Sequence, residues 1–202
     1  MALPEMPVLE GEYVRLEPLS HEHAADLCVA TEDGKVHELW YTAIPSPGGM
    51  NAEIDRRLGL YGQGTMMPFA TIDVACGKAI GMTTFMNIKL ENLKMEIGST
   101  WMAASHQGTA INPEAKLLML SYAFDILGCN AVELRTHEKN EQSRAAIQKL
   151  GATLDGLLRN DMVMANGTLR NTAVYSITKD EWPAVHDGLV ARLDDLEQAE
   201  EA

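Results

Sequence analysis

Two short stretches of this chain combine residue types and spacings that can carry chemistry. The first, Gln107-Gly108-Thr109-Ala110-Ile111-Asn112-Pro113, joins an apolar run to a helical pattern through small residues. Glycine and alanine let a ligand come close to the backbone, and the first N–H groups of a helix are unpaired and lie at the positive end of its dipole. The stretch therefore predicts a site for an anion such as phosphate, and a plain strand-to-helix turn is the alternative interpretation.

Other familiar site signatures are missing from the sequence. No Gly-Lys-Ser or Gly-Lys-Thr follows the loop, as in a P-loop, and the loop lacks the Gly-x-Gly-x-x-Gly pattern of dinucleotide-binding folds. No His, Cys and carboxylate residues share metal-ligand spacing, so no metal is expected. A Ser-His-Asp hydrolase is unsupported, because the chain has no nucleophile elbow.

The second stretch, residues 136–152, completes a resemblance to a known enzyme family. The loop is similar to motif A of the GCN5-related N-acetyltransferase (GNAT) superfamily, Arg/Gln-x-x-Gly-x-Gly/Ala, with Gly108 and Ala110 in the last two positions. Residues 136–152 resemble the Asn-x-x-Ser-x-x-x-Ile-x-Lys-x-Gly signature of the ribosomal-protein N-terminal acetyltransferase branch, about 30 residues further on. The likeness spans roughly residues 10–182, and it departs from motif A at Ser105, which takes the Arg/Gln position.

The resemblance implies acetyl-CoA as the acetyl donor and assigns residues to it. The strands at 94–102 and 131–136 are expected to splay apart, so that the pantetheine arm can pair with exposed backbone like an extra strand. The implied contacts are backbone groups of Trp101 and Met102 for pantetheine, backbone groups of Gln107, Gly108, Thr109, Ala110 and Asn112 for pyrophosphate, and the polar side chains of Asn140 and Ser143.

Acetylation of an amine makes limited chemical demands on a protein. The amine must be neutral, the developing oxyanion needs an N–H donor, and the leaving thiolate gains from a proton. By position, Ser143 is the candidate proton donor, and a hydroxyl that only hydrogen-bonds the cofactor or the helix backbone is the alternative. Glu96 is the candidate base, acting through water, and a solvent-facing strand carboxylate or a substrate-orienting charge is the alternative. Glu91 is a weaker substitute.

The acceptor is expected to be a primary amine, either a protein N-terminus or a small molecule. The segments 40–50, 89–92 and 161–170 should shape its pocket, and Trp40 and Tyr41 are candidate walls, with plain packing as the alternative. Two other functions remain open. One is a non-catalytic CoA-binding or regulatory module on the same fold, and the other is a nucleotide-binding protein that uses the same loop.

The charge of the chain narrows its partners. A formal net charge of −13 argues against a nucleic-acid surface, which needs clustered Lys and Arg. Such a surface attracts cationic amines or basic peptides, although it can equally serve solubility. No stretch approaches the roughly 20 apolar residues that span a bilayer. The three cysteines are scattered and form no disulfide framework, which fits a reducing cytoplasm.

Hydrophobic periodicity predicts the elements that position these residues. We expect strands at 13–18, 67–74, 78–88, 94–102 and 131–136, and a closing hairpin of 153–164 and 169–178 around Asn166-Gly167. Helices are expected from the caps Ser20 and Asn51 to about residues 31 and 61, over 113–127 after the cap Asn112, and over 141–150 after the cap Asn140.

This order predicts an α/β protein with a mixed sheet covered by helices on both faces. The resemblance adds the GNAT fold, in which the sheet is mostly antiparallel and splays at its central parallel pair, and a possible homodimer through the late strands. We expect residues 1–202 to form a single N-acetyltransferase domain. Its core covers about residues 10–182, and an acidic tail, 183–202, frays from about residue 194.

Overall fold

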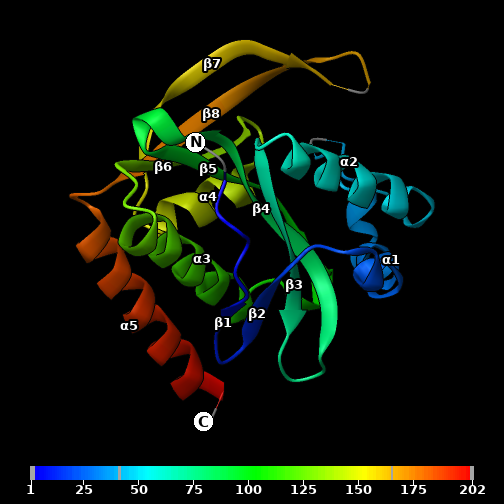
Figure 1. Ribbon diagram of the computed structural model, residues 1–202, viewed down its shortest axis with the longest axis horizontal. Coiled ribbons are helices and arrows are strands. Elements are labelled where there is room, and N and C mark those ends of the chain that lie inside the picture. Colours follow the sequence, from blue (N-terminus) through cyan, green and yellow to red (C-terminus); the bar gives the residue numbers. More distant parts are fainter. Residues whose placement is uncertain (1–2, 41, 165, 201–202) are drawn as a thin grey trace.

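The computed structural model describes residues 3–40, 42–164 and 166–200. Its centre is one eight-stranded sheet in the order β1-β2-β3-β4-β5-β6-β8-β7 (Figure 1). Neighbouring strands pair antiparallel, except for β5 and β6, which pair parallel. The predicted α/β class and mixed sheet are therefore confirmed. The strands are β1 (Leu9–Glu10), β2 (Val14–Pro18), β3 (Met66–Asp73), β4 (Lys78–Lys89), β5 (Lys94–Met102), β6 (Ala131–His137), β7 (Thr153–Val163) and β8 (Leu169–Thr178).

Helices cover both faces of this sheet, as predicted. In Figure 1, α1 and α2 lie on one side of it and α3 and α5 on the other. No helix of the described chain is long and apolar enough to cross a membrane. The helices are α1 (Ala24–Glu32), α2 (Met50–Gly62), α3 (Ile111–Ser121), which continues as one π-helical turn (Tyr122–Ile126), α4 (Glu141–Lys149) and α5 (Trp182–Glu200).

Two separate cores form because the central strands bury side chains on both faces. Along β3, Met67 and Phe69 pack into the core under α3, whereas Ala70 and Ile72 pack into the core under α1 and α2. Successive side chains of a strand point to opposite faces, so one strand serves both layers. This arrangement leaves the strand ends between the layers free to form a site.

Two of the four predicted helix caps were wrong. Asn51 is not a helix cap, because α2 begins at Met50 with Gly49 at the N-cap. Asn112 is not one either, since α3 begins at Ile111 and Ala110 occupies the N-cap without a side-chain hydrogen bond. The caps Ser20 and Asn140 are confirmed, because each side chain accepts a hydrogen bond from a backbone N–H of the following turn.

The acidic tail is helical rather than frayed as far as Glu200. Trp182 begins α5, stacks on Phe124 with 5.3 Å between the ring centroids, and donates its indole N–H to Asp125 at 2.9 Å. Val185 and Leu189 are buried against the core under α3. These contacts fix the start of α5 to the π-helical turn and explain why an acidic segment stays helical.

Candidate functional site

The parallel pair β5–β6 opens toward its carboxyl ends, as predicted. Pairing covers only Lys94 to Glu96 of β5, opposite Ala131 to Glu133 of β6, while the strands continue to Met102 and His137. Beyond this point the two strands are not hydrogen-bonded to each other, and we call the space between them the gap. Such a gap can accept an extended ligand by backbone hydrogen bonding, as a sheet edge accepts a strand.

The loop before α3 presents unpaired amides at one end of this gap. Within the described chain, no hydrogen bond comes from the backbone N–H groups of Gly108, Thr109, Ala110 or Asn112. Gly108 has a φ of +82°, which glycine adopts without strain, and a Cβ placed there would meet nothing within 4 Å. Four free amides at a helix start, beside open space, form an anion cradle.

Neighbouring residues hold the loop in place. Ser105, in the position where the family pattern has Arg or Gln, donates its hydroxyl to Asp33 at 2.5 Å, and its N–H donates to the same carboxylate at 3.1 Å. These hydrogen bonds lower the pKa of Asp33. His106 lies 3.3 Å from Asp73. Ser105 therefore ties the loop to the segment after α1.

Gln107 uses its side chain where the sequence predicted a backbone contact. Its amide nitrogen donates to the carbonyl of Met102 at 3.3 Å, and its oxygen accepts from Gln142 of α4 at 3.3 Å. The Met102 carbonyl, one of the groups predicted to bind pantetheine, thus has an internal partner. Gln107 connects the end of β5 to the start of α4 beside the gap.

Asn140 and Ser143 lie at the start of α4. The Asn140 side-chain oxygen accepts the backbone N–H of Ser143 at 3.0 Å, so Asn140 caps the helix. No hydrogen bond of the Ser143 hydroxyl is seen among the described residues. The Ser143 hydroxyl therefore remains available to a ligand.

Glu96 lies at the last paired position of β5, where the gap begins. Only 5% of it is exposed, so it is not a solvent-facing carboxylate. It accepts a hydrogen bond from the Asn87 amide at 2.7 Å, and Arg135 of β6 lies 3.4 Å away. Burial raises the pKa of Glu96 above its ordinary value, although Asn87 and Arg135 oppose that rise.

A second carboxylate beside Glu96 titrates in the opposite direction. Glu133 lies directly across the strand pair, and burial alone would raise its pKa. Hydrogen bonds from Lys94 and Arg135 outweigh burial and lower the pKa of Glu133. Because the pKa values of these two adjacent carboxylates shift in opposite directions, Glu96 can accept a proton while Glu133 stays charged.

Aromatic and basic side chains from other elements border the same face of the sheet. Trp40, which precedes α2 and is 51% exposed, meets His137 edge-on with 5.3 Å between the ring centroids. Arg170 of β8 donates to Thr172 at 3.0 Å and acts electrostatically on Glu96 and His137. Tyr41 lies outside the described residues. Of the three segments predicted to shape the acceptor pocket, 40–50 therefore contacts β6 at Trp40 and 161–170 reaches β8 at Arg170, whereas 89–92 connects β4 to β5.

The side chain of Trp101 also lies at the site, although the sequence predicted a role only for its backbone. Its ring is buried against α1 and α2, and its indole N–H has no hydrogen-bond partner in the described chain. Two further buried residues, Arg57 and Lys116, reach β5 near Trp101 from opposite faces. No motif marks either residue, because each is a single basic residue in a helical pattern.

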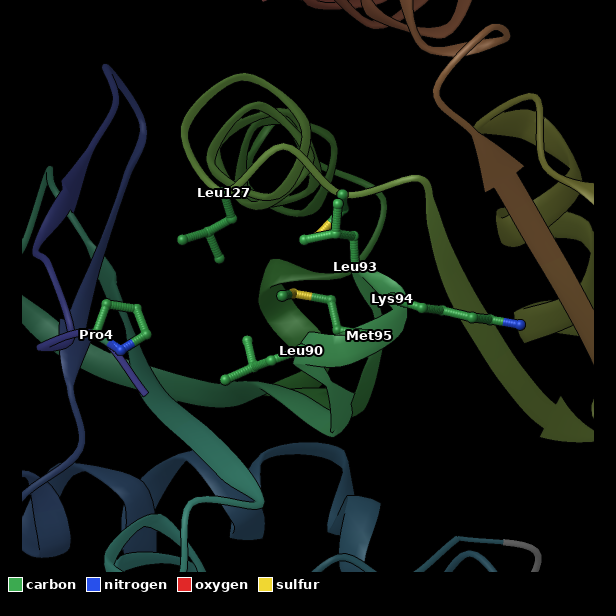
Figure 2. A pocket seen from close by; sticks show the side chains of 7 residues that line it. Pro4, Leu90, Leu93, Lys94, Met95 and Leu127 are labelled. Atoms are coloured by element: carbon green, nitrogen blue, oxygen red, sulfur yellow. The ribbon is translucent and has the colours of Figure 1, made fainter. Parts of the chain in front are cut away.

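One apolar cavity lies away from this site. Figure 2 shows a hollow of about 250 Å³ between the start of β5 and the end of α3, into which Leu90, Leu93, Met95 and Leu127 project, while Lys94 points out of it. Its lining is almost wholly apolar. Lys94 and Cys129 are the polar residues of its lining, and none of the predicted site residues lines it, so it is not part of the candidate site.

Comparisons with known proteins agree with this geometry. A family model described as an acetyltransferase (GNAT) domain matches residues 14–153. The chain is 34% identical over 106 residues to the "Putative ribosomal N-acetyltransferase YdaF" of Bacillus subtilis (strain 168), a match that covers 52% of the chain and 57% of the relative. The match thus spans little more than half the length of this curated relative.

Solved structures show the same fold over nearly the whole chain. A GCN5-related N-acetyltransferase from Brucella melitensis superposes with a TM-score of 0.84 at 32% identity, covering 94% of this chain and 86% of that one. RimJ of Mycobacterium smegmatis, solved in complex with CoA-disulfide, superposes with a TM-score of 0.75 at 23% identity, covering 89% and 88%. The second likeness is one of fold alone.

Proposed function

The chain belongs to the GNAT acetyltransferase family, and we propose that it transfers an acetyl group from acetyl-CoA to a primary amine by direct attack. The observation that carries the proposal is the cradle of four unpaired amides at Gly108, Thr109, Ala110 and Asn112, placed at the end of the gap between β5 and β6. The pyrophosphate of a CoA molecule needs N–H donors, and its extended pantetheine arm needs strand backbone without a partner. The site offers both.

The residues of the site fit the charge of the pyrophosphate of acetyl-CoA. The open space at Gly108 and the helix dipole of α3 favour a pyrophosphate there. We assign pyrophosphate to Gln107 and the four residues of the cradle, the pantetheine arm to the β5 backbone at Trp101 and Met102, and a polar contact to Asn140 and Ser143. When bound, the thioester supplies the activated acetyl group.

Two side chains of the chain itself then handle protons. Glu96, with its raised pKa, accepts a proton through water from the ammonium group of the acceptor, so that the neutral amine attacks the thioester, and the Ser143 hydroxyl donates a proton to the departing sulfur. Glu96 is buried next to the gap, and the Ser143 hydroxyl makes no hydrogen bond with the described residues, so both groups are available for these roles. Glu91, in the middle of the turn between β4 and β5, is exposed.

The proposal extends to the acceptor and the assembly. A protein N-terminus or a small amine would enter on the face bordered by Trp40, His137 and Arg170, and the net charge of −13 favours a cationic acceptor. The relative from Bacillus subtilis is named for a ribosomal acceptor, which supports testing ribosomal peptides first. We further propose a homodimer through the late strands, and a cytoplasmic location in keeping with three free cysteines.

A panel of amines tests the function. Purified protein is incubated with acetyl-CoA and, separately, peptides with free N-termini, amino acids and polyamines, while thiol release and acetylated products are measured. Matched release and product formation with at least one amine is the expected result. CoA binding without turnover on any amine would favour a non-catalytic module, and tighter binding of ATP than of CoA would favour a nucleotide-binding protein.

A further inference from the structure

A two-residue bulge interrupts β5 at the mouth of the gap. Met82 of β4 pairs with Trp101 and Thr84 pairs with Gly98, so Ser99 and Thr100 both lie opposite the single residue Thr83. Ser99 has a φ of +48°, a left-handed conformation that serine rarely adopts. We call Ser99 and Thr100 the β5 bulge. Strained bulges persist only where the surroundings hold them.

Arg57 of α2 holds the bulge from one face of the sheet. Its side chain is almost fully buried and donates to the carbonyl of Ser99 at 3.2 Å and to the hydroxyl of Thr84 at 2.7 Å. A third bond goes to Glu53 at 2.7 Å, which balances the charge. The rigid guanidinium thus joins α2, β4 and the strained residue of β5.

Lys116 of α3 holds the bulge from the opposite face. Its ammonium donates to the hydroxyl of Thr100 at 3.2 Å, and that hydroxyl lies 2.8 Å from the hydroxyl of Thr83. Among the described residues, Lys116 has Thr100 as its hydrogen-bond partner and forms no ion pair with a carboxylate. Burial lowers the pKa of Lys116 to about 8.

Stability alone does not account for the buried ammonium of Lys116, whereas Glu53 balances the charge of Arg57. Burying an ammonium with a single neutral partner is costly, and an apolar side chain of similar length would fill the same space more favourably. Both residues end at the same two-residue bulge, from helices of different layers. The bulge lies within the part of β5 that has lost its pairing with β6.

We propose that Arg57 and Lys116 are positioning residues that clamp the β5 bulge from both faces and so hold the β5 backbone in the shape that receives the thioester arm. The inference rests on the proposed function, because the shape matters only if acyl-CoA binds in the gap. Arg57 fixes the peptide of Ser99, and Lys116 fixes the side chain of Thr100. Neither residue touches the amine or needs to exchange a proton.

The first test compares Arg57→Met with Arg56→Met. Arg56 is the adjacent residue of α2, binds the same Glu53, and is exposed. Arg57→Met is expected to lower kcat/KM for acetyl-CoA about 10²-fold, since a misplacement of about 1 Å can cost that much. Arg56→Met should stay within about twofold of wild type, and Arg57→Lys should recover part of the loss.

The second test uses Lys116→Met, which keeps the length of the side chain and removes its charge. Its melting temperature is expected to equal or exceed that of the wild type, because a costly buried cation is lost. Its kcat/KM is expected to fall about tenfold, as positioning effects are shared with Arg57. Amide hydrogen exchange at residues 98–101 of the ligand-free protein should quicken in both Arg57→Met and Lys116→Met.

The outcomes separate this inference from the proposed function. If the wild type transfers acetyl and folded Arg57→Met and Lys116→Met match it in kcat/KM and in exchange at residues 98–101, the clamp is wrong. If Arg57→Met does not fold, Arg57→Lys and Lys116→Met decide the question by the same two readouts. A wild type that transfers acetyl to no amine overturns the proposed function itself.

Discussion

Glu96 combines burial, a neighbouring cation and a strand end in one residue. It lies where β5 and β6 separate, with Asn87 at 2.7 Å and Arg135 at 3.4 Å. Desolvation outweighs both partners, so its pKa is raised. A base with a raised pKa accepts a proton more readily near neutral pH than an ordinary carboxylate does.

Replacing Glu96 with Gln tests this role through the pH profile. Glu96 works as a base only when ionised, so wild-type kcat should fall as the pH drops through its raised pKa. Glu96→Gln is expected to lower kcat about 10²-fold and to remove that acidic limb. Glu133→Gln, which changes the paired carboxylate across the strands, is the control and should keep the limb. An unchanged limb in Glu96→Gln would reject the assignment.

Ser143 offers a second test at the scale of a single atom. Its hydroxyl makes no internal hydrogen bond in the described chain, while its backbone N–H is used by the Asn140 cap. Ser143→Ala should therefore leave α4 intact and lower kcat about 10²-fold if the hydroxyl donates a proton. Steady-state kinetics with Ser121→Ala as control measure this. A change confined to the acetyl-CoA affinity would make Ser143 a binding residue only.

At the scale of elements, a single large side chain in the loop before α3 can block the space that the pyrophosphate would occupy. Gly108→Trp places a large ring where a Cβ meets nothing within 4 Å and where the unpaired amides point. Calorimetry should show acetyl-CoA affinity falling at least tenfold, because the ring occupies the phosphate space.

Gly77 provides a matched control for this substitution. It has a φ of +69°, also without a neighbour within 4 Å of a Cβ, and it lies in the β3–β4 turn. Gly77→Trp carries the same backbone strain as Gly108→Trp and should bind acetyl-CoA like the wild type. Equal affinity in both variants would place the anion site elsewhere.

Local signals in the sequence predicted the elements whose ends are chemically marked. Asn140 and Gly151 bound α4 as expected, and the alternating apolar strands β3 to β6 lie within two residues of their predicted ends. The start of α3 was placed too late because Asn112 and Pro113 resemble a cap and a first-turn proline, whereas the chain already turns helical at Ala110. The conformation of the loop, rather than the capping propensity of Asn112, therefore determines where α3 begins.

The rest of the site depends on contacts between distant residues. The spacing of Trp182, Val185 and Leu189 is helical, yet only their burial against the core under α3 reveals α5. Arg57 and Lys116 belong to ordinary helical patterns, and their meeting at the β5 bulge depends on two layers assembled on opposite faces. A sequence pattern read along one element does not contain such long-range pairs.

At the scale of the whole molecule, the edge strand β7 predicts self-association. It ends the sheet, is exposed along nearly its whole length, and carries apolar side chains that include Leu157, Leu158 and Val163. An exposed apolar edge strand is a pairing surface. Light scattering should find a dimer, and the double substitution Leu157→Lys with Leu158→Lys should yield a monomer.

Val29→Lys, which changes an exposed apolar residue of α1, is the control for the dimer and should not alter the mass. A monomeric wild type would show that β7 does not pair with a second copy. If the wild type is a dimer, the activity of the monomeric double variant shows whether the site needs the partner chain.

One measurement tests the central claim, that this molecule moves an acetyl group directly from acetyl-CoA to an amine. Excess protein is mixed with acetyl-CoA carrying an isotope-labelled acetyl group and a cell-extract mixture of peptides and small amines, and mass spectrometry locates the label. We expect label on the amino group of an acceptor and none retained on the protein. Label that remains on CoA with every amine, although CoA binds, would contradict the central claim.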